Sequence, residues 1–249
     1  MAETNPNRPS DGPATKFIAD HLVTSLFTRE ADYFGLVLVA GWPPNQMMDQ
    51  AYQQFLDEVR SCFHKSDLES AVGPPNVYLY PTQCLHVTIA TLHHVHKKRP
   101  DLGKDYYYEL TEKYVDFVKA ASQCDAWPKC TNQVDGDGSV QSPPQMKLQL
   151  ELVQLGQKAG ILLWNDKSGY INAVRDCLQK EATQRGIQID SIPNIIHSTF
   201  LRFAHEPIHS GSGEEIQQKF QSIVIPKANA MFSVTSQPIV MFGMIHYVN

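Results

Sequence analysis

Hydrophobic and polar residues follow two different periods along this chain, and each period predicts a different kind of element. Mostly apolar runs cover residues 33–40 and 85–92, which is typical of strands buried in a core. Residues 146–153 instead alternate strictly between apolar and polar, which predicts a strand with one buried face. Shorter apolar or β-branched segments predict further strands at 77–80, 160–164, 196–200, 232–234 and 239–248.

Other segments have apolar residues at the 3.6-residue spacing of an amphipathic helix. This spacing predicts helices over 47–63, 104–122 and 168–185, and Gly186 ends the last of them. Gly211-Ser212-Gly213 before Glu214 indicates either a helix cap or a plain loop. Residues 125–145 are rich in Gly, Pro, Ser, Asn and Asp, and therefore predict a long surface loop.

The same order of elements occurs twice. A strand near residues 34–39 and another near 161–164 are each followed by an amphipathic helix and then by a further strand. This repeated order predicts an α+β protein built from two related units with approximate symmetry. We expect residues 1–30 to form an N-terminal tail and lead-in, and 31–249 to form a single domain.

Each of the two later strands carries the pattern His-x-Thr. The first copy is His86-Val87-Thr88 and the second is His197-Ser198-Thr199. Because side chains alternate across a strand, the His and the Thr of each copy point to one face. If the two faces meet, they supply an acid, a base and two hydroxyl donors, which suits metal-free attack on a phosphodiester.

A single His-x-Thr triplet is a weak signal. The chain has ten histidines, and His64-Lys65-Ser66 fits a looser version of the pattern within or just beyond a predicted helix. A strand histidine that simply pairs with a neighbour is the more frequent finding for one such site. His86 and His197 each lie in an apolar strand, and the order of elements before them is the same. These two features together favour the hypothesis that the two motifs form one site.

Composition limits the kinds of partner that the chain is expected to bind. The chain has 21 Lys and Arg against 26 Asp and Glu, a formal net charge of -5, which argues against strong non-specific binding to long nucleic acids. The five cysteines are odd in number and widely scattered, and no apolar run suggests a leader or a membrane span. We therefore expect an intracellular, cytoplasmic protein with no membrane partner, acting as a monomer.

The two motifs, their strand context and their order resemble the 2H phosphoesterase superfamily, over roughly residues 33–249. The resemblance implies a bilobal α+β fold: two pseudo-symmetric lobes of antiparallel sheet plus helices around a central cleft. It implies that His86 and His197 are catalytic, that Thr88 and Thr199 bind the substrate phosphate, and that no cofactor or metal is needed. The implied substrate is a small nucleotide or an RNA end carrying a cyclic or 2',5'-linked phosphodiester, with a 2',3'-cyclic phosphate as the first to test. The predicted 125–145 loop exceeds what a compact member needs.

Further candidates for substrate binding come from residue type. Tyr33, Phe34, Trp42 and Tyr247 offer aromatic rings on which a base or ribose can stack, although packing is the commoner role for each. Arg202 follows His197 by five positions, which places it on the opposite face of a regular strand. Only a bend brings it to the site, and a surface ion pair is its alternative role.

Two other functions stay open at this point. His94 and His96 share a face of a regular strand and, with His86, form a candidate metal site for a metal-dependent hydrolase. The basic run that follows them, 97–99, opposes a bound cation and instead suits attraction of a phosphate. The second alternative is a protein that binds nucleotide or RNA-end phosphates without turning them over.

Overall fold

The computed structural model of the chain describes residues 16–20, 32–42, 46–70, 75–127, 133–134, 140–141, 146–206, 208–233 and 241–246. Its strands are β1 (Tyr33–Gly41), β2 (Val77–Leu79), β3 (His86–Lys97), β4 (Gln133–Val134), β5 (Val140–Gln141), β6 (Leu148–Leu155), β7 (Ala159–Asp166), β8 (His197–Phe203) and β9 (Met241–His246). Its helices are α2 (Gln46–Ser61), α3 (Lys65–Leu68), η1 (Thr82–Cys84), α4 (Lys104–Ala121), α5 (Tyr170–Arg185), α6 (Gly213–Lys219), η2 (Phe220–Val224) and α7 (Ile225–Ser233).

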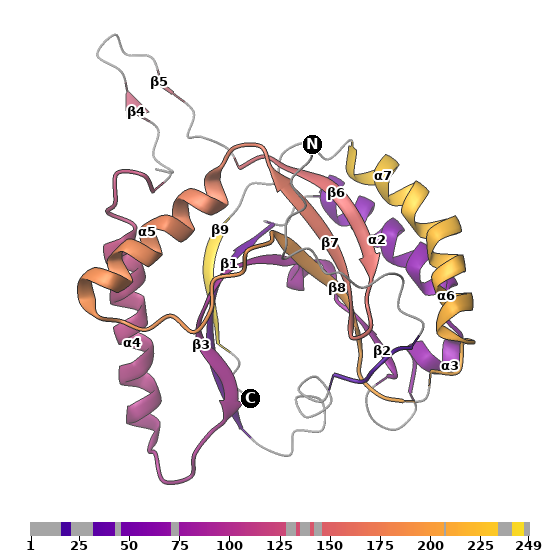
Figure 1. The fold of residues 1–249 in the computed structure, drawn as a ribbon, viewed down its shortest axis with the longest axis horizontal. Coiled ribbons are helices and arrows are strands. Elements are labelled where there is room, and N and C mark those ends of the chain that lie inside the picture. The colour runs from indigo at the N-terminus through magenta and orange to yellow at the C-terminus, as the bar shows by residue number, and fades with distance from the viewer. Residues whose placement is uncertain are drawn as a thin grey trace, which may run out of the picture.

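Two antiparallel sheets form the body of the protein, as expected for an α+β fold. One has the strand order β3-β1-β9 and the other has the order β2-β8-β7-β6. Helices α4 and α5 cover the outer face of the first sheet, and α2, α6 and α7 cover the outer face of the second (Figure 1). The opposite, inner faces of the two sheets turn toward one another.

The two strand–helix–strand units predicted by the sequence exchange their helices. Helix α2 follows β1 of the first sheet but packs on the second, where Phe55 meets Phe200 with ring centroids 5.0 Å apart. Helix α5 follows β7 of the second sheet but packs against β3 and α4 of the first (Figure 1). Because each unit covers the sheet of the other, the two halves cannot separate without exposing both cores.

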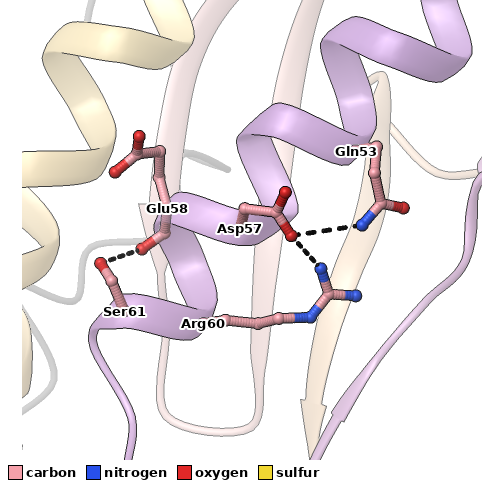
Figure 2. Close-up of polar contacts among 5 residues, drawn as sticks. All are labelled: Gln53, Asp57, Glu58, Arg60 and Ser61. Atoms are coloured by element: carbon pink, nitrogen blue, oxygen red, sulfur yellow. Dashed lines mark hydrogen bonds and ion pairs between the residues drawn. The ribbon is translucent and has the colours of Figure 1, made fainter.

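Helix α2 illustrates how an amphipathic segment lies on the sheet. Its buried side chains, Tyr52, Phe55, Leu56 and Val59, recur at helical spacing and face the core. On the exposed side, the Asp57 carboxylate accepts hydrogen bonds from Gln53 and Arg60 (Figure 2). Glu58 pairs with Lys227 of α7 at 2.6 Å and so joins the two helices.

The sequence prediction of a strand at 232–234 was wrong for its described residues, because Phe232 and Ser233 end helix α7. The physical reason is a stripe of buried residues spaced four apart: Ile216, Phe220, Val224, Ala228 and Phe232. This spacing places all five on one face of a continuous helical segment. The predicted cap at Ser212 is present, since its hydroxyl accepts from the Glu215 amide and the Glu215 carboxylate accepts from the Ser212 amide.

Residues 16–20 lie along the second sheet. The ring of Phe17 stacks on Phe203 at 4.2 Å, and the amide of Asp20 donates to the Phe203 carbonyl at 2.7 Å. Most of the predicted 125–145 loop lies outside the described residues, apart from the short β4–β5 pair and residues 125–127. The division into a 1–30 lead-in and a 31–249 domain stays a prediction. No described helix has the length and apolar content to cross a lipid bilayer.

Candidate functional site

The two His-x-Thr motifs begin the strands β3 and β8, which contact one another where the two sheets meet. In the first sheet, Thr88 pairs with Val39 of β1. The β1 residues that join the core under α4 and α5 are Leu36, Leu38 and Ala40, so Val39 and its partner Thr88 lie on the inner face. In the second sheet, the neighbours of Thr199 along the strand, Ser198 and Phe200, are buried toward the helices.

A β-bulge follows each motif at the same place. Between Leu38 and Val39 of β1, the register of β3 moves from Ala90 to Thr88, which leaves Ile89 as the extra residue. Between Gly160 and Ile161 of β7, the register of β8 moves from Leu201 to Thr199, so Phe200 is the extra residue. Ile89 and Phe200 are both fully buried. The symmetry predicted from element order therefore extends to the local geometry of both strands.

The bulge also decides where Arg202 lies. Residues 86–92 and 197–203 have the same burial pattern, with half-buried side chains at the first, third and sixth positions. The sixth position is Thr91 in the first copy and Arg202 in the second. A regular strand would have put Arg202 on the face opposite His197, but the extra residue Phe200 restores it to the same face.

The middle residue of each motif anchors its strand to the core. Val87 is fully buried among apolar side chains. Ser198 is also fully buried, and its hydroxyl accepts a 3.0 Å hydrogen bond from the indole Nε1 of Trp164. With the middle side chain fixed in the core, the His and Thr on either side of it are held on the inner face.

His86 is oriented by its own backbone. Its Nδ1 lies 2.7 Å from the carbonyl oxygen of Cys84, which can only accept, so this nitrogen donates and Nε2 is left for the site. Burial lowers the pKa of His86, the Cys84 carbonyl opposes that shift, and the charge of Arg202 adds to it. His86 is therefore neutral at pH 7 but has one partner that favours its protonated form.

His197 has only groups that disfavour its protonation. Burial is the largest cause, followed by the positive charges of Arg202, Arg175 and protonated His86, and together they lower the pKa of His197 to about 4. The effect of one histidine on the other, and of Arg202 on both, places the three side chains in one electrostatic neighbourhood. The structure thus brings together the two motifs that lie 111 positions apart in the chain.

Arg202 is held by a carboxylate and retains an unused donor. Its Nη1 lies 2.6 Å from Oδ2 of Asp20 in the N-terminal segment, in a half-buried ion pair. Its Nε is buried and has no hydrogen-bond partner among the described residues. A buried guanidinium nitrogen without an acceptor is a feature of a site that receives an anion or a water.

Two tyrosines that the sequence analysis did not single out flank Arg202. Tyr78 of β2 pairs directly with Arg202 of β8, and neighbouring Val77 pairs with buried Phe203, so Tyr78 and Tyr80 lie on the inner face. Their rings meet edge to face at 5.0 Å, and both are half-buried. The sequence feature that could have identified them is the two-residue spacing of the tyrosines in the predicted strand 77–80.

The aromatic residues proposed from the sequence are mostly elsewhere. Tyr33 lies at the far end of β1, eight residues or roughly 26 Å from the Gly41 that pairs with His86. Phe34 is 2 % exposed and packs on Tyr107. Trp42 follows Gly41, the residue that pairs with His86. Its ring centroid lies 5.5 Å from that of Trp164. Phe34 therefore has the packing role, substrate binding by Trp42 stays a prediction, and Tyr247 lies outside the described residues.

The three histidines of the alternative metal site do not come together. One extra residue in β3 between His93 and His96 changes the alternation, so His96 shares a face with His93, at 4.9 Å between rings, and not with His94. That face meets Tyr107 of α4, whereas His86 is ten residues, roughly 33 Å, along the strand on the inner face. Across the described part of the chain, no three His, Cys, Asp or Glu side chains gather as a metal site would need.

The basic run 97–99 is equally distant from the motifs. It follows the far end of β3, where Arg99 pairs with Asp101 at 2.5 Å and the Lys98 ammonium lies 5.7 Å from the ring of Tyr107. The expectation that this run draws phosphate to the site was wrong, because β3 is extended and carries its two ends apart. His64 precedes α3 and is exposed.

Comparison with known proteins finds solved structures with a similar fold, two of which are described below. The sequence matches no protein-family model and no curated protein. Escherichia coli LigT, solved in complex with 3'-AMP, is 15% identical over 71% of this chain and 76% of its own, with a TM-score of 0.40. Kluyveromyces marxianus Usb1, solved with uridine monophosphate, is 11% identical over 88% of this chain and 99% of its own, with a TM-score of 0.41.

Proposed function

We propose that this chain is a phosphodiesterase of the 2H type, which hydrolyses a cyclic or 2',5'-linked phosphodiester of a nucleotide or RNA end without a metal. The observation that carries the proposal is that β3 and β8 contact one another and that His86, His197 and Arg202 lie on their inner faces. Two imidazoles beside one guanidinium match what such a reaction needs: a base, an acid and a positive charge for the phosphoryl oxygens.

The surroundings of the two histidines divide their roles. His197, whose pKa is about 4 among three positive groups, is neutral at physiological pH and acts as the base that takes a proton from water. The water oxygen forms a bond to phosphorus as the bond to the ribose oxygen breaks. His86, whose Nδ1 donates to the Cys84 carbonyl, gives the proton on Nε2 to that leaving oxygen. The negative charge of a bound phosphate raises the fraction of His86 that is protonated.

The remaining inner-face residues bind the substrate. The Thr88 and Thr199 hydroxyls donate to non-bridging oxygens, and Arg202 offers its unpartnered Nε to the same group. Tyr78 and Tyr80 stand beside Arg202 and provide the ring faces on which a nucleobase stacks. These two tyrosines replace Tyr33 and Phe34 as the candidates for base binding.

The experiment is a substrate panel run with EDTA in every reaction. It compares 2',3'-cyclic, 3',5'-cyclic and 2',5'-linked nucleotides and an RNA with a cyclic phosphate end, and measures the phosphomonoester formed. We expect the wild-type chain to cleave at least one 2',3'-cyclic or 2',5'-linked substrate, and His86→Asn and His197→Asn to lose nearly all of that activity. His64→Gln is the matched control and keeps it.

Three outcomes would overturn the proposal. Activity abolished by EDTA indicates a metal-dependent hydrolase. Tight binding of nucleotide phosphates with no product from any substrate indicates the non-catalytic binder. Full activity in both His86→Asn and His197→Asn removes the motifs from the chemistry.

A further inference from the structure

Among the described residues, Arg175 is a buried cation that the reaction described above does not use. Arg175 of α5 is 6 % exposed and lies in the stripe of residues by which that helix packs on the first sheet, with Ile171, Val174 and Leu178. An arginine among the apolar positions of a helix is the sequence signal that would have found it. Among the described residues its guanidinium has no carboxylate within ion-pair distance, and desolvation lowers its pKa to about 10.

The guanidinium binds backbone carbonyls of the first motif strand and of the segment just before the second. Its Nη2 donates to the carbonyl of Thr88 at 3.0 Å, and its Nε donates to that of Ile89 at 3.2 Å. The same Nη2 donates to the carbonyl of Ile195 at 3.1 Å, two residues before His197. One side chain thus joins the first motif to the segment that leads into the second.

Arg175 also fills a gap in the hydrogen bonding of the first bulge. In the second motif, the carbonyl of the bulged residue Phe200 accepts from the Tyr80 amide at 2.9 Å, because β2 runs beside β8. At the corresponding edge of β3 the described residues form no strand, only an isolated antiparallel bridge between Thr91 and Ser191. The carbonyl of its bulged residue, Ile89, accepts from Arg175 instead. A buried carbonyl without a hydrogen-bond donor is costly in free energy. The guanidinium therefore supplies the donor that a neighbouring strand supplies in the second motif.

We infer that Arg175 is a positioning residue of the phosphodiester site: it fixes the first motif's bulge, holds the two motifs at their working separation and places a positive charge behind them. This inference rests on the proposed function for its kinetic part. Its structural part concerns the histidines alone and is measurable without substrate.

The charge and the geometry of Arg175 are separable by substitution. Arg175→Lys keeps the charge but cannot bind three carbonyls on two segments, since an ammonium lacks the planar fork. Arg175→Met removes both. Asp67→Asn is the matched control. Asp67 lies on α3, away from both motifs, and is also buried and polar. Its carboxylate accepts hydrogen bonds from the Asn76 side chain, the His209 amide and the Ser210 hydroxyl.

The experiment measures kcat and KM on the substrate identified by the panel, and the titration of His86 and His197 by NMR without substrate. The groups that act on His197 are Arg202, Arg175 and His86, and those that act on His86 are Arg202 and the Cys84 carbonyl. We expect kcat to fall about 10-fold in Arg175→Lys and about 100-fold in Arg175→Met, with KM changed less, because small displacements of reacting groups cost that much. His197 should titrate at higher pH in Arg175→Met and at the wild-type pH in Arg175→Lys.

Each contrary result bears on one part of the inference. A folded Arg175→Met with kcat within twofold of wild type and an unmoved His197 titration overturns it. So does an Asp67→Asn variant of equal stability that loses as much kcat. If Arg175→Met does not fold, an Arg175→Lys variant with unchanged kcat overturns the positioning role. If no substrate is cleaved by any variant, the proposed function fails, and the His197 titration still decides whether Arg175 acts on the motif.

Discussion

Gly160 of β7 lies directly beneath the ring of Phe200, the bulged residue of β8. A Cβ at position 160 would come within 2.7 Å of Phe200 Cε2, a separation that real Cβ atoms do not adopt. The ring cannot move away, because it stacks on Phe220 at 6.0 Å and meets Phe55 edge to face. The absence of a side chain at Gly160 is therefore what allows the bulge that turns Arg202 toward the histidines.

The first prediction concerns Gly160→Ala. Overpacking at this contact should destabilise the fold by about 1–3 kcal/mol and displace the bulge, so kcat/KM should fall further than the lost stability explains. Urea denaturation and steady-state kinetics measure the two effects. Gly103→Ala is the control, because nothing lies within 4 Å of a Cβ there. A stable, fully active Gly160→Ala variant would show that the bulge does not control the site.

The second prediction concerns acid stability. His197 has a pKa of about 4 in the folded protein against about 6.5 in an unfolded chain, so the unfolded chain binds the proton more readily. Stability due to this group is therefore complete above pH 6.5 and is lost as the pH falls toward 4, by about 2 kcal/mol at pH 5. Urea denaturation at pH 7 and pH 5 measures the loss. His197→Gln should lessen it.

The third prediction concerns Arg202→Met. Loss of the guanidinium removes a phosphate contact, and we expect KM to rise about 10- to 100-fold, as for one or two charge-assisted hydrogen bonds. It also removes a positive charge that acts on both imidazoles, so His86 and His197 should both titrate at higher pH. Arg60→Met, which removes an exposed arginine also paired with an aspartate, is the matched control (Figure 2). Equal KM values for the two variants would place Arg202 outside the site.

The fourth prediction concerns Ser198→Ala. This change leaves the buried Nε1 of Trp164 without its acceptor, and we expect a loss of about 1–3 kcal/mol in the free energy of unfolding. Because Ser198 faces the core and not the histidines, kcat should stay within a few fold of wild type. Ser222→Ala, on the exposed side of η2, is a control for the loss of a hydroxyl. A large fall in kcat with unchanged stability would show that Ser198 takes part in the reaction.

Local pattern was enough to predict most of the elements. The apolar runs and the alternation at 146–153 predicted β1 and β6 to within two residues and the start of β3, which extends five residues beyond the predicted end, and the helical spacing predicted α2, α4 and α5. The strand predicted at 232–234 failed because three residues are too few to show the four-residue stripe that begins at Ile216. The cytoplasmic location and monomeric state stay predictions.

The sequence by itself determined which side chains belong to each strand and that His86 and Thr88, like His197 and Thr199, share a face, because alternation is a local property of an extended backbone. Only the tertiary structure decided that the two pairs meet, that a bulge at Phe200 brings Arg202 to their side, and that Arg175 joins β3 to the segment before β8. A bulge depends on what packs above and below the extra residue, and a buried hydrogen bond depends on which carbonyls lack a neighbouring strand. Both are set by residues far apart in the chain, such as Gly160 beneath Phe200 and α5 across the edge of β3.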